Sequence, residues 1–243
     1  MNEKFLEILK YLRMNNLIAN WDEYIKLEEQ DNYSNVKLLK YIFEEEYKIK
    51  KENSRKLRIN KAHIPEKFVI ETFPFDRQPN LNKKKLLSIY DDFGYMRKKQ
   101  NIIFIGPTGC GKTGLATSFL IQAINKEYTG RYILFCELIN TLHKSIADHS
   151  EENVIKKFAA YDCLHIDEMV YVETDPAQIG LFFILLHKRH KKRTTLITSN
   201  LGFSEWNSFL KNEHLTAALI DRITENSYVI NMKNCVSLRA KLK

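Results

Sequence analysis

The stretch Gly106-Pro107-Thr108-Gly109-Cys110-Gly111-Lys112-Thr113 decides the fold of this chain of 243 residues. It matches the pattern of a phosphate-binding loop, in which a strand leads into a glycine-rich turn and a helix follows. An apolar run at residues 101–105 precedes it, and a helical-looking stretch begins at Lys112. The pattern alone should arise by chance in about one chain in a hundred of this length, and the flanking strand and helix make chance rarer still.

The residue types of this loop suit a phosphate chain. Gly106, Gly109 and Gly111 allow positive φ angles, so that successive backbone N–H groups can face the β-phosphate at a helix N-terminus. Lys112 supplies a positive charge for the β- and γ-phosphates, and the Thr113 hydroxyl can complete the coordination of a Mg²⁺ ion. The alternative is a glycine-rich turn without a ligand. We therefore expect the whole loop to bind a nucleoside triphosphate.

Length and composition limit the class of protein. A chain with 44% hydrophobic residues can fill the core of one α/β domain and a small additional module. The net charge of +8 favours an anionic partner such as nucleic acid. The cysteines are scattered without metal-ligand spacing, which argues against a zinc site or a disulfide framework and fits a reducing cytoplasm. The longest apolar run, 179–186, is too short for a membrane span, and the N-terminus lacks the apolar block of an export signal.

The N-terminal part of the chain shows helical periodicity. Apolar residues within 5–27 recur at helical spacing with a break near Asn15 and Asn16, which predicts two short helices, and 35–59 predicts a longer one. Prolines within 73–79 then interrupt regular structure, and Asn82 can cap a helix that extends to about residue 90. We therefore assign residues 1–66 to an all-helical partner or assembly module, and residues 67–243 to a nucleotide-binding domain.

After the phosphate loop, short apolar or β-branched runs alternate with helical stretches. The expected strands are 131–136, 163–167, 194–198 and 228–231. This alternation predicts an α/β fold in which helices cover both faces of a parallel sheet. The run 131–136 lies in sequence between the strands that carry the two nucleotide motifs, and it predicts one strand inserted between them.

Two carboxylates end the expected strand 163–167. Asp167 is expected to hold Mg²⁺ and Glu168 to orient the attacking water, since this edge of a parallel sheet faces the nucleotide. A pair of carboxylates favours hydrolysis over storage of the nucleotide, although acidic residues also end strands for turn chemistry alone. His165, within the strand, is interpreted as a structural histidine with satisfied hydrogen bonds.

The next expected strand ends in Thr198-Ser199-Asn200. The Asn200 amide can bond the γ-phosphate or the attacking water, and so detect hydrolysis. The alternative is that Asn200 begins a turn before Gly202.

Taken together, these motifs resemble the IstB transposition helper ATPases, which belong with the DnaC-type helicase loaders among the AAA+ proteins. The resemblance covers nearly the whole chain, and Phe203-Ser204-Glu205-Trp206 and the linker Phe75-Asp76-Arg77-Gln78-Pro79 discriminate best. The sequence departs from the family pattern at Val170, where relatives usually carry Gly, and at Gly114, where His is common. Both departures leave the catalytic positions intact.

The resemblance implies an AAA+ P-loop ATPase that uses ATP and Mg²⁺ and forms a homo-oligomer with inter-subunit ATP sites. Arg222 matches the family's arginine finger, which would reach the nucleotide of the neighbouring subunit, and Arg239 matches the second sensor, which would act on the nucleotide of its own subunit. An arginine finger is worth about 10³- to 10⁵-fold in rate, so an isolated subunit should hydrolyse ATP poorly. Without the resemblance, Arg222 would be interpreted as the partner of Asp221 in a surface ion pair. The expected catalytic set is Lys112, Glu168, Asn200, Arg222 and Arg239.

Basic clusters at 48–58, 83–85 and 188–193 add to the case for DNA. Each phosphate that they neutralise on duplex DNA contributes a salt slope of about −0.9, so contacts repeated around an oligomer would bind strongly without sequence readout. For any single cluster, the alternative is a solvated helix end.

Three functions are compatible with these features. The first is a DNA-transposition helper that assembles on duplex DNA with ATP, bends it and recruits a partner transposase. The second is a replicative-helicase loader, whose N-terminal helices would grip the helicase and whose ATPase domain would prefer single strands. The third is a small-molecule kinase or a nucleotide-gated binding module, but the sequence offers no lid or acceptor pocket, and the two arginines would be surplus. The discriminating segments favour the first.

Overall fold

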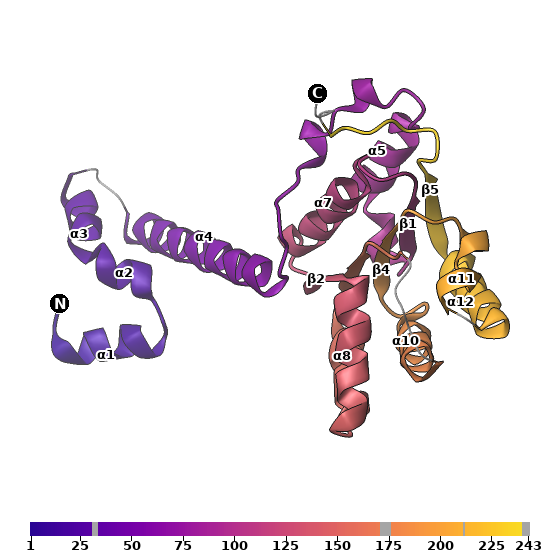
Figure 1. Ribbon diagram of the computed structural model, residues 1–243. Coiled ribbons are helices and arrows are strands. Elements are labelled where there is room, and N and C mark those ends of the chain that lie inside the picture. The colour runs from indigo at the N-terminus through magenta and orange to yellow at the C-terminus, as the bar shows by residue number, and fades with distance from the viewer. Residues whose placement is uncertain (31–33, 171–175, 211, 240–243) are drawn as a thin grey trace. The chain divides into compact units, whose positions relative to one another are not determined.

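The computed structural model describes residues 1–30, 34–170, 176–210 and 212–239 (Figure 1). The chain divides into two compact units, Met1–Leu57 and Arg58–Lys243, each of which is described by itself. This division falls within helix α4 (Asn35–Lys61), and not at residue 66. Among the described residues, no helix is both long enough and apolar enough to cross a membrane.

The first unit is helical, as predicted, but its opening segment differs from the expectation. In place of two short helices it forms α1 (Glu3–Tyr11), α2 (Asn15–Ala19) and α3 (Trp21–Gln30). The additional break is at Asn20, whose side-chain amide donates to the Asn16 carbonyl at 3.1 Å and so competes with helical bonding. Buried Glu46 of α4 accepts the N–H groups of Asn16 and Leu17, both at 3.1 Å, at the start of α2. The core of this unit contains Leu9, Met14, Leu17, Tyr24 and Ile42.

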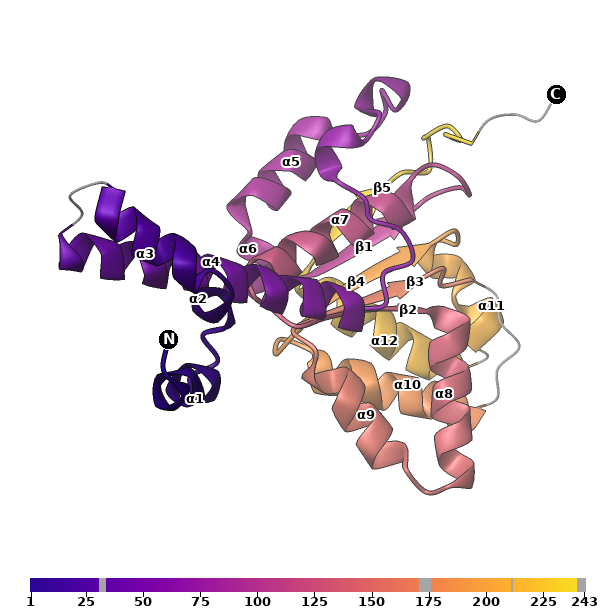
Figure 2. The same ribbon diagram turned by 90° about the vertical axis from the view of Figure 1, so that its left-hand side faces the viewer.

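The second unit is built on a five-stranded sheet in which every pairing is parallel, which confirms the predicted fold class (Figure 2). Its strands are β1 (Asn101–Ile105), β2 (Gly130–Leu134), β3 (Cys163–Asp167), β4 (Thr194–Ser199) and β5 (Ser227–Asn231). The order across the sheet is β2-β3-β4-β1-β5.

One strand does separate the two motif strands β1 and β3, but it is β4 and not the expected β2. All six residues of β4 are buried, which suits a central strand, whereas β2 is partly exposed and forms an edge. The strand expected at 131–136 also ends earlier, at Leu134. Residues from Phe135 onward form α8 (Phe135–Ala147), because Leu138, Ile139 and Leu142 continue a buried helical face.

Helices cover both faces of the sheet (Figure 2). One apolar core lies between the sheet, α5 (Lys83–Asp92) and α7 (Lys112–Asn125), and includes Phe104 and Phe119. The other lies on the opposite face and includes Phe135, Phe182 and the fully buried Trp206 of the Phe-Ser-Glu-Trp segment. The helices of that face are α8, α9 (Glu151–Ala160), α10 (Pro176–Arg189), α11 (Asn207–Leu210) and α12 (Glu213–Glu225). A short helix, α6 (Gly94–Arg97), leads into β1.

The parallel sheet has two different edges. The phosphate loop follows β1, Glu168 follows β3 and Asn200 follows β4, so the predicted nucleotide residues gather at the carboxyl edge. The opposite edge, where the strands begin, carries the connections that enter the sheet. We call it the amino edge.

Candidate nucleotide-binding site

The glycines of the phosphate loop have different reasons to be glycine. Gly109 and Gly111 have φ angles of 80° and 96°, in the left-handed region that was expected of all three. Gly106 does not, which corrects the expectation. It is constrained by a close approach instead, because a Cβ atom there would lie 2.7 Å from the carbonyl oxygen of Met232.

Lys112 is the first residue of α7, is 6% exposed, and reaches back into the phosphate loop. Its ammonium group donates to the carbonyl oxygens of Gly106 at 2.7 Å and Pro107 at 2.8 Å, and to the Asn200 side-chain oxygen at 2.6 Å. Burial lowers the pKa of Lys112 from its ordinary value. The contact with Asn200 brings the end of β4 to the phosphate loop. Asn200 must lie there if it is to contact the γ-phosphate.

The Asp167 carboxylate accepts hydrogen bonds from three side chains. One carboxylate oxygen accepts from the hydroxyls of Thr113, at 3.0 Å, and Thr198, while the other accepts from the Tyr132 hydroxyl at 2.8 Å. Burial alone would raise the pKa of Asp167, but nearby His165 and the hydroxyls of Thr198 and Tyr132 hold this pKa well below its usual value. Asp167 is therefore ionised, and its carboxylate accepts from hydroxyls on three neighbouring elements, α7, β2 and β4.

His165 is fully buried, but its hydrogen bonds are not satisfied as the sequence suggested. Its Nε2 atom lies 3.5 Å from the nearer Asp167 oxygen, and neither ring nitrogen has a hydrogen-bond partner in the described part of the chain. Its ring packs against the edge of the Tyr132 ring, with 5.1 Å between the centroids.

Glu168 projects into the same cavity from the end of β3. Its side chain is exposed, its φ angle is 53°, and its N–H group donates to the Thr198 hydroxyl at 3.0 Å. The next residue, Met169, is bonded to the backbone of Thr198 at 2.8 Å. The N–H groups of Glu168 and Met169 thus tie this segment to β4. A left-handed backbone is uncommon for a residue other than glycine, and such conformations cluster at functional sites.

Lys112, Asp167 and Glu168 line a cavity of about 600 Å³. Its polar end is formed by the phosphate loop, Asp167, Glu168 and Asn200, and its apolar end by Phe68, Val69, Phe73 and Pro74. The two ends fit each other closely: a Cβ atom at Gly111 would lie 2.5 Å from the Phe73 ring, and one at Gly114 would lie 3.0 Å from the Phe68 ring. An apolar end next to a phosphate loop suits the base of a nucleotide.

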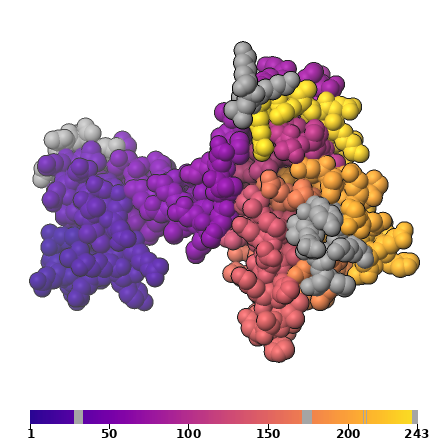
Figure 3. Space-filling view, viewed as in Figure 1, coloured from indigo at the N-terminus to yellow at the C-terminus, as the bar shows by residue number. Residues whose placement is uncertain are grey.

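Gln78 of the linker joins the phosphate loop to the C-terminal segment. It is 1% exposed, its amide donates to the carbonyls of Cys110 at 3.2 Å and Val236 at 2.6 Å, and its oxygen accepts from the Val236 N–H at 2.9 Å. Figure 3 shows the C-terminal segment, in yellow, beside the purple linker region. The Leu238 N–H in turn donates to the Gly109 carbonyl at 2.8 Å, which places Arg239 at the rim of the cavity.

Arg222 is not part of this cavity. It lies near the end of α12, half-buried, with its guanidinium 4.6 Å from the centre of the Phe183 ring. Within the described residues its Nη1 atom has no hydrogen-bond partner and it forms no ion pair with Asp221. The structure therefore brings Lys112, Glu168, Asn200 and Arg239 together and leaves Arg222 apart from them.

The basic cluster 188–193 is partly structural. Arg189 is 1% exposed and donates to the carbonyls of Phe158 at 2.9 Å and Tyr161 at 2.7 Å, at the end of α9. Lys191 pairs with Glu225, and Arg193 pairs with Asp162 at 3.0 Å. Of the cluster, Lys188 and Lys192 are exposed and lack an ion pair in the described structure.

Sequence reasoning missed Tyr132, Gln78 and the apolar end of the cavity. Tyr132 had one signal, since it is a polar-tipped residue inside a short apolar run. Gln78 had another, because it stands in the linker that carries much of the family resemblance. Neither feature of the sequence shows which residue the side chain contacts. Tyr132, for example, contacts Asp167, which lies 35 residues further along the chain.

We expect Tyr132→Phe to weaken Mg²⁺-dependent ATP binding by about 10- to 100-fold, because a residue that orients a metal-ligating carboxylate contributes that much to metal affinity. The measurement is a titration of Mg²⁺ against a fluorescent ATP analogue. Tyr128→Phe is the matched control, since that hydroxyl does not contact Asp167. Equal Mg²⁺ dependence in the two variants would remove Tyr132 from the site.

Comparison with known proteins agrees with this geometry. The family model described as "IstB-like ATP binding protein" matches residues 7–243. An ATP-binding protein of insertion sequence IS232 from Bacillus thuringiensis subsp. berliner is 28% identical over 225 residues, which are 92% of this chain and 89% of that protein. That of insertion sequence IS21 from Pseudomonas aeruginosa is 25% identical over 226 residues, or 93% of this chain and 85% of that protein.

Solved structures show the same fold at lower identity. The DnaC helicase loader has a TM-score of 0.53 at 19% identity, covering 62% of this chain and 87% of that chain. AMPPCP-bound DnaA from Aquifex aeolicus has a TM-score of 0.57 at 14% identity, covering 70% of this chain and 51% of that chain. The sheet and its helices are thus those of an AAA+ P-loop protein.

Proposed function

The chain belongs to the family of IstB-like ATP-binding proteins, and from this premise we propose that it is an ATP-dependent helper of DNA transposition. In this proposal ATP drives self-assembly on duplex DNA with little sequence preference, and the assembly bends the duplex and recruits a partner transposase. Hydrolysis of ATP then dismantles or remodels the assembly. The relatives named above belong to insertion sequences, which supports the transposition context.

One observation supports this proposal more than any other: the subunit holds all but one of the expected ATPase residues around a single cavity. Lys112 bonds to Asn200, Thr113 bonds to Asp167, and Arg239 lies at the rim. The missing residue is Arg222. A site that lacks its arginine within the subunit, in a chain that carries that arginine outside the cavity, is suited to completion by a second copy.

The donor atoms of the site fit Mg²⁺. Thr113 and Asp167 offer hard oxygen ligands 3.0 Å apart, and no group of three or more His, Cys, Asp and Glu suited to a metal ion occurs among the described residues. Mg²⁺ typically binds through one or two protein oxygens together with substrate phosphates, so this sparse set is sufficient. When bound, the ion would neutralise charge on the β- and γ-phosphate oxygens.

The protein's own residues then have distinct tasks. The loop N–H groups and Lys112 hold the phosphates, and the cavity end at Phe68 and Phe73 receives the base. Glu168 orients the attacking water, Asn200 contacts the γ-phosphate, and Arg239 stabilises the charge that develops in the transition state. Arg222 of a neighbouring subunit completes the site.

Lys112→Ala tests the proposed function. It should weaken ATP binding by at least about 100-fold, since removal of a charged partner from a buried site costs about 3 kcal/mol or more. DNA binding by the variant should then no longer respond to ATP, as measured by fluorescence anisotropy with a labelled duplex. Lys144→Ala, an exposed lysine of α8, is the control.

Two outcomes would count against the transposition proposal. If Lys112→Ala bound duplex DNA as the wild-type protein does in the presence of ATP, nucleotide would not control assembly. If the wild-type protein bound single strands in preference to the duplex and co-purified with a replicative helicase, the helicase-loader function would replace it.

A further inference from the structure

The amino edge of the sheet collects lysines that neither the core nor the nucleotide site uses. Because all strands run in parallel, the connections that enter β1, β2 and β4 meet along this edge. They carry Lys98 and Lys99, Lys126, and Lys192, respectively, and Lys188 lies in the last turn of α10, immediately before the β4 connection. Lys99 is half-buried and the others are exposed. We call these five residues the amino-edge lysines.

Contacts between the connections fix these lysines near one another. The Asn226 amide donates to the carbonyls of Lys98 at 3.3 Å and Lys99 at 3.2 Å. The amine of Lys99 lies 5.8 Å from the centre of the Tyr128 ring, and that of Lys126 lies 5.1 Å from the centre of the Phe93 ring.

Two further contacts join the β4 connection to the same place. The Thr194 hydroxyl donates to the Tyr95 carbonyl at 3.0 Å, and the Asn101 side chain accepts from the Thr195 N–H, also at 3.0 Å. Buried Arg189 holds the end of α10 in place immediately before Lys192. These hydrogen bonds tie the connections to the ends of the strands and of α10.

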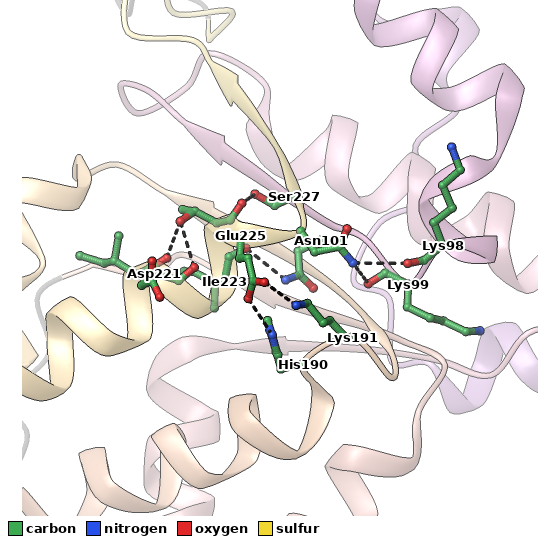
Figure 4. Close-up of polar contacts among 12 residues, drawn as sticks. Lys98, Lys99, Asn101, His190, Lys191, Asp221, Ile223, Glu225 and Ser227 are labelled. Carbon is green, nitrogen blue, oxygen red and sulfur yellow. Dashed lines mark hydrogen bonds and ion pairs between the residues drawn. The ribbon is translucent and has the colours of Figure 1, made fainter.

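Three carboxylates near this edge are paired with basic side chains. Figure 4 shows Glu225 accepting from Lys191 and His190, while the amine ends of Lys98 and Lys99 point away from it. Asp162 pairs with Arg193 at 3.0 Å, and Asp92 pairs with Arg97 at 2.9 Å. Within the described ranges, none of the amino-edge lysines has a carboxylate partner. Glu127, next to Lys126, is the one carboxylate within residues 97–100, 126–129 and 188–193, so these connections together carry a net positive charge.

The chemistry of this surface fits a phosphate backbone better than a protein. Lysine is depleted in protein interfaces, whose centres are apolar and aromatic, and the connections at 97–100, 126–129 and 188–193 have no large exposed apolar side chain. Lysines are common in contacts with DNA phosphates, where they need no base-specific geometry. The edge is also opposite the ATP cavity, so the two ligands can be bound at once.

We propose that the amino-edge lysines contact the phosphate backbone of duplex DNA. This inference rests on the proposed function, because it assigns a surface to the DNA binding proposed there. It also implies that ATP and DNA act on opposite edges of one sheet, and that their coupling passes through assembly and not through direct contact.

The test is the triple variant Lys98→Gln, Lys188→Gln and Lys192→Gln in the full chain. These side chains are exposed and make no ion pair, so the fold should persist, with unchanged ATP affinity as the check. Binding to a labelled duplex of random sequence is measured with ATP between about 50 and 200 mM salt. The plot of log affinity against log salt should become less steep by about 0.9 for each lost contact, or up to about 2.7 per bound subunit.

A matched triple variant, Lys144→Gln, Lys156→Gln and Lys157→Gln, removes the same charge from α8 and α9. Its salt slope should stay close to that of the wild type. An equal decrease in salt slope in both variants would show an effect of net charge alone. A decrease in the α8–α9 variant alone would place the DNA-binding surface on those helices. Either result overturns the inference. So does an unchanged slope accompanied by lost binding to phosphatidylserine vesicles, which would assign the surface to membranes. Failure of the wild-type protein to bind duplex DNA would refute the proposed function itself.

Discussion

Replacing Arg222 with Ala should lower the ATP hydrolysis rate of the assembled protein by about 10³- to 10⁵-fold. ATP affinity should be nearly unchanged, because Arg222 does not line the cavity of its own subunit. The physical reason is that the positive charge acts on the transition state and not on the bound nucleotide. The measurement is the steady-state rate at a protein concentration that saturates assembly.

The Arg222 variant needs two controls, because its guanidinium also packs on the Phe183 ring. Arg222→Lys keeps a cation there but lacks the planar fork of arginine, so its rate should remain far below that of the wild type while its stability is preserved. Mixing Arg222→Ala with Lys112→Ala should restore activity, since each variant supplies what the other lacks at a hybrid interface. Two inactive variants that stay inactive when mixed would contradict catalysis between subunits.

Replacing Glu168 with Gln should lower hydrolysis by about 10²- to 10⁴-fold while ATP still binds. Glutamine has nearly the same shape, so the left-handed backbone and the bond from the Glu168 N–H to Thr198 should persist. The amide cannot take a proton from water as a carboxylate can. Because hydrolysis dismantles the assembly in our account, the variant should also stay on DNA much longer in ATP.

Single-turnover hydrolysis and the dissociation rate from a labelled duplex measure these two effects. Glu66→Gln is the matched control, since it removes a carboxylate from the wall of the same cavity without a predicted role in the reaction. If both variants lost hydrolysis rate equally, the effect of Glu168 would be that of its negative charge alone, and not of a specific role in orienting water. A variant that hydrolyses slowly but leaves DNA at the wild-type rate would separate hydrolysis from disassembly.

The parts of the fold that follow from local pattern could be predicted from the sequence. The phosphate loop, β3 and the end of β4 are short stretches whose residue types report their own conformation, and β3 was predicted at its observed bounds, Cys163–Asp167. Asn82 caps α5 through a 2.9 Å bond from the Lys85 N–H, as its position suggested. Helix α4 likewise follows from its own periodicity.

The remaining features depend on contacts between residues far apart in the chain. The position of β4 between β1 and β3 depends on how fully each strand is buried. The residues of a strand indicate its burial only weakly. Gly106 is glycine because of Met232, and Arg189 is buried because it bonds to the end of α9. In the sequence, every basic residue of the run 188–193 looks equally exposed. In the structure Arg189 is buried, and Lys191 and Arg193 are paired with carboxylates.

We propose that one subunit carries an incomplete ATPase site and that a second copy completes this site on DNA. The most direct test is the ATPase rate per subunit as a function of protein concentration, with and without duplex DNA. We expect a low rate at high dilution, a steep rise as subunits assemble, and a shift of that rise to lower concentration when duplex DNA is added. A rate per subunit that is independent of both protein concentration and DNA would contradict it.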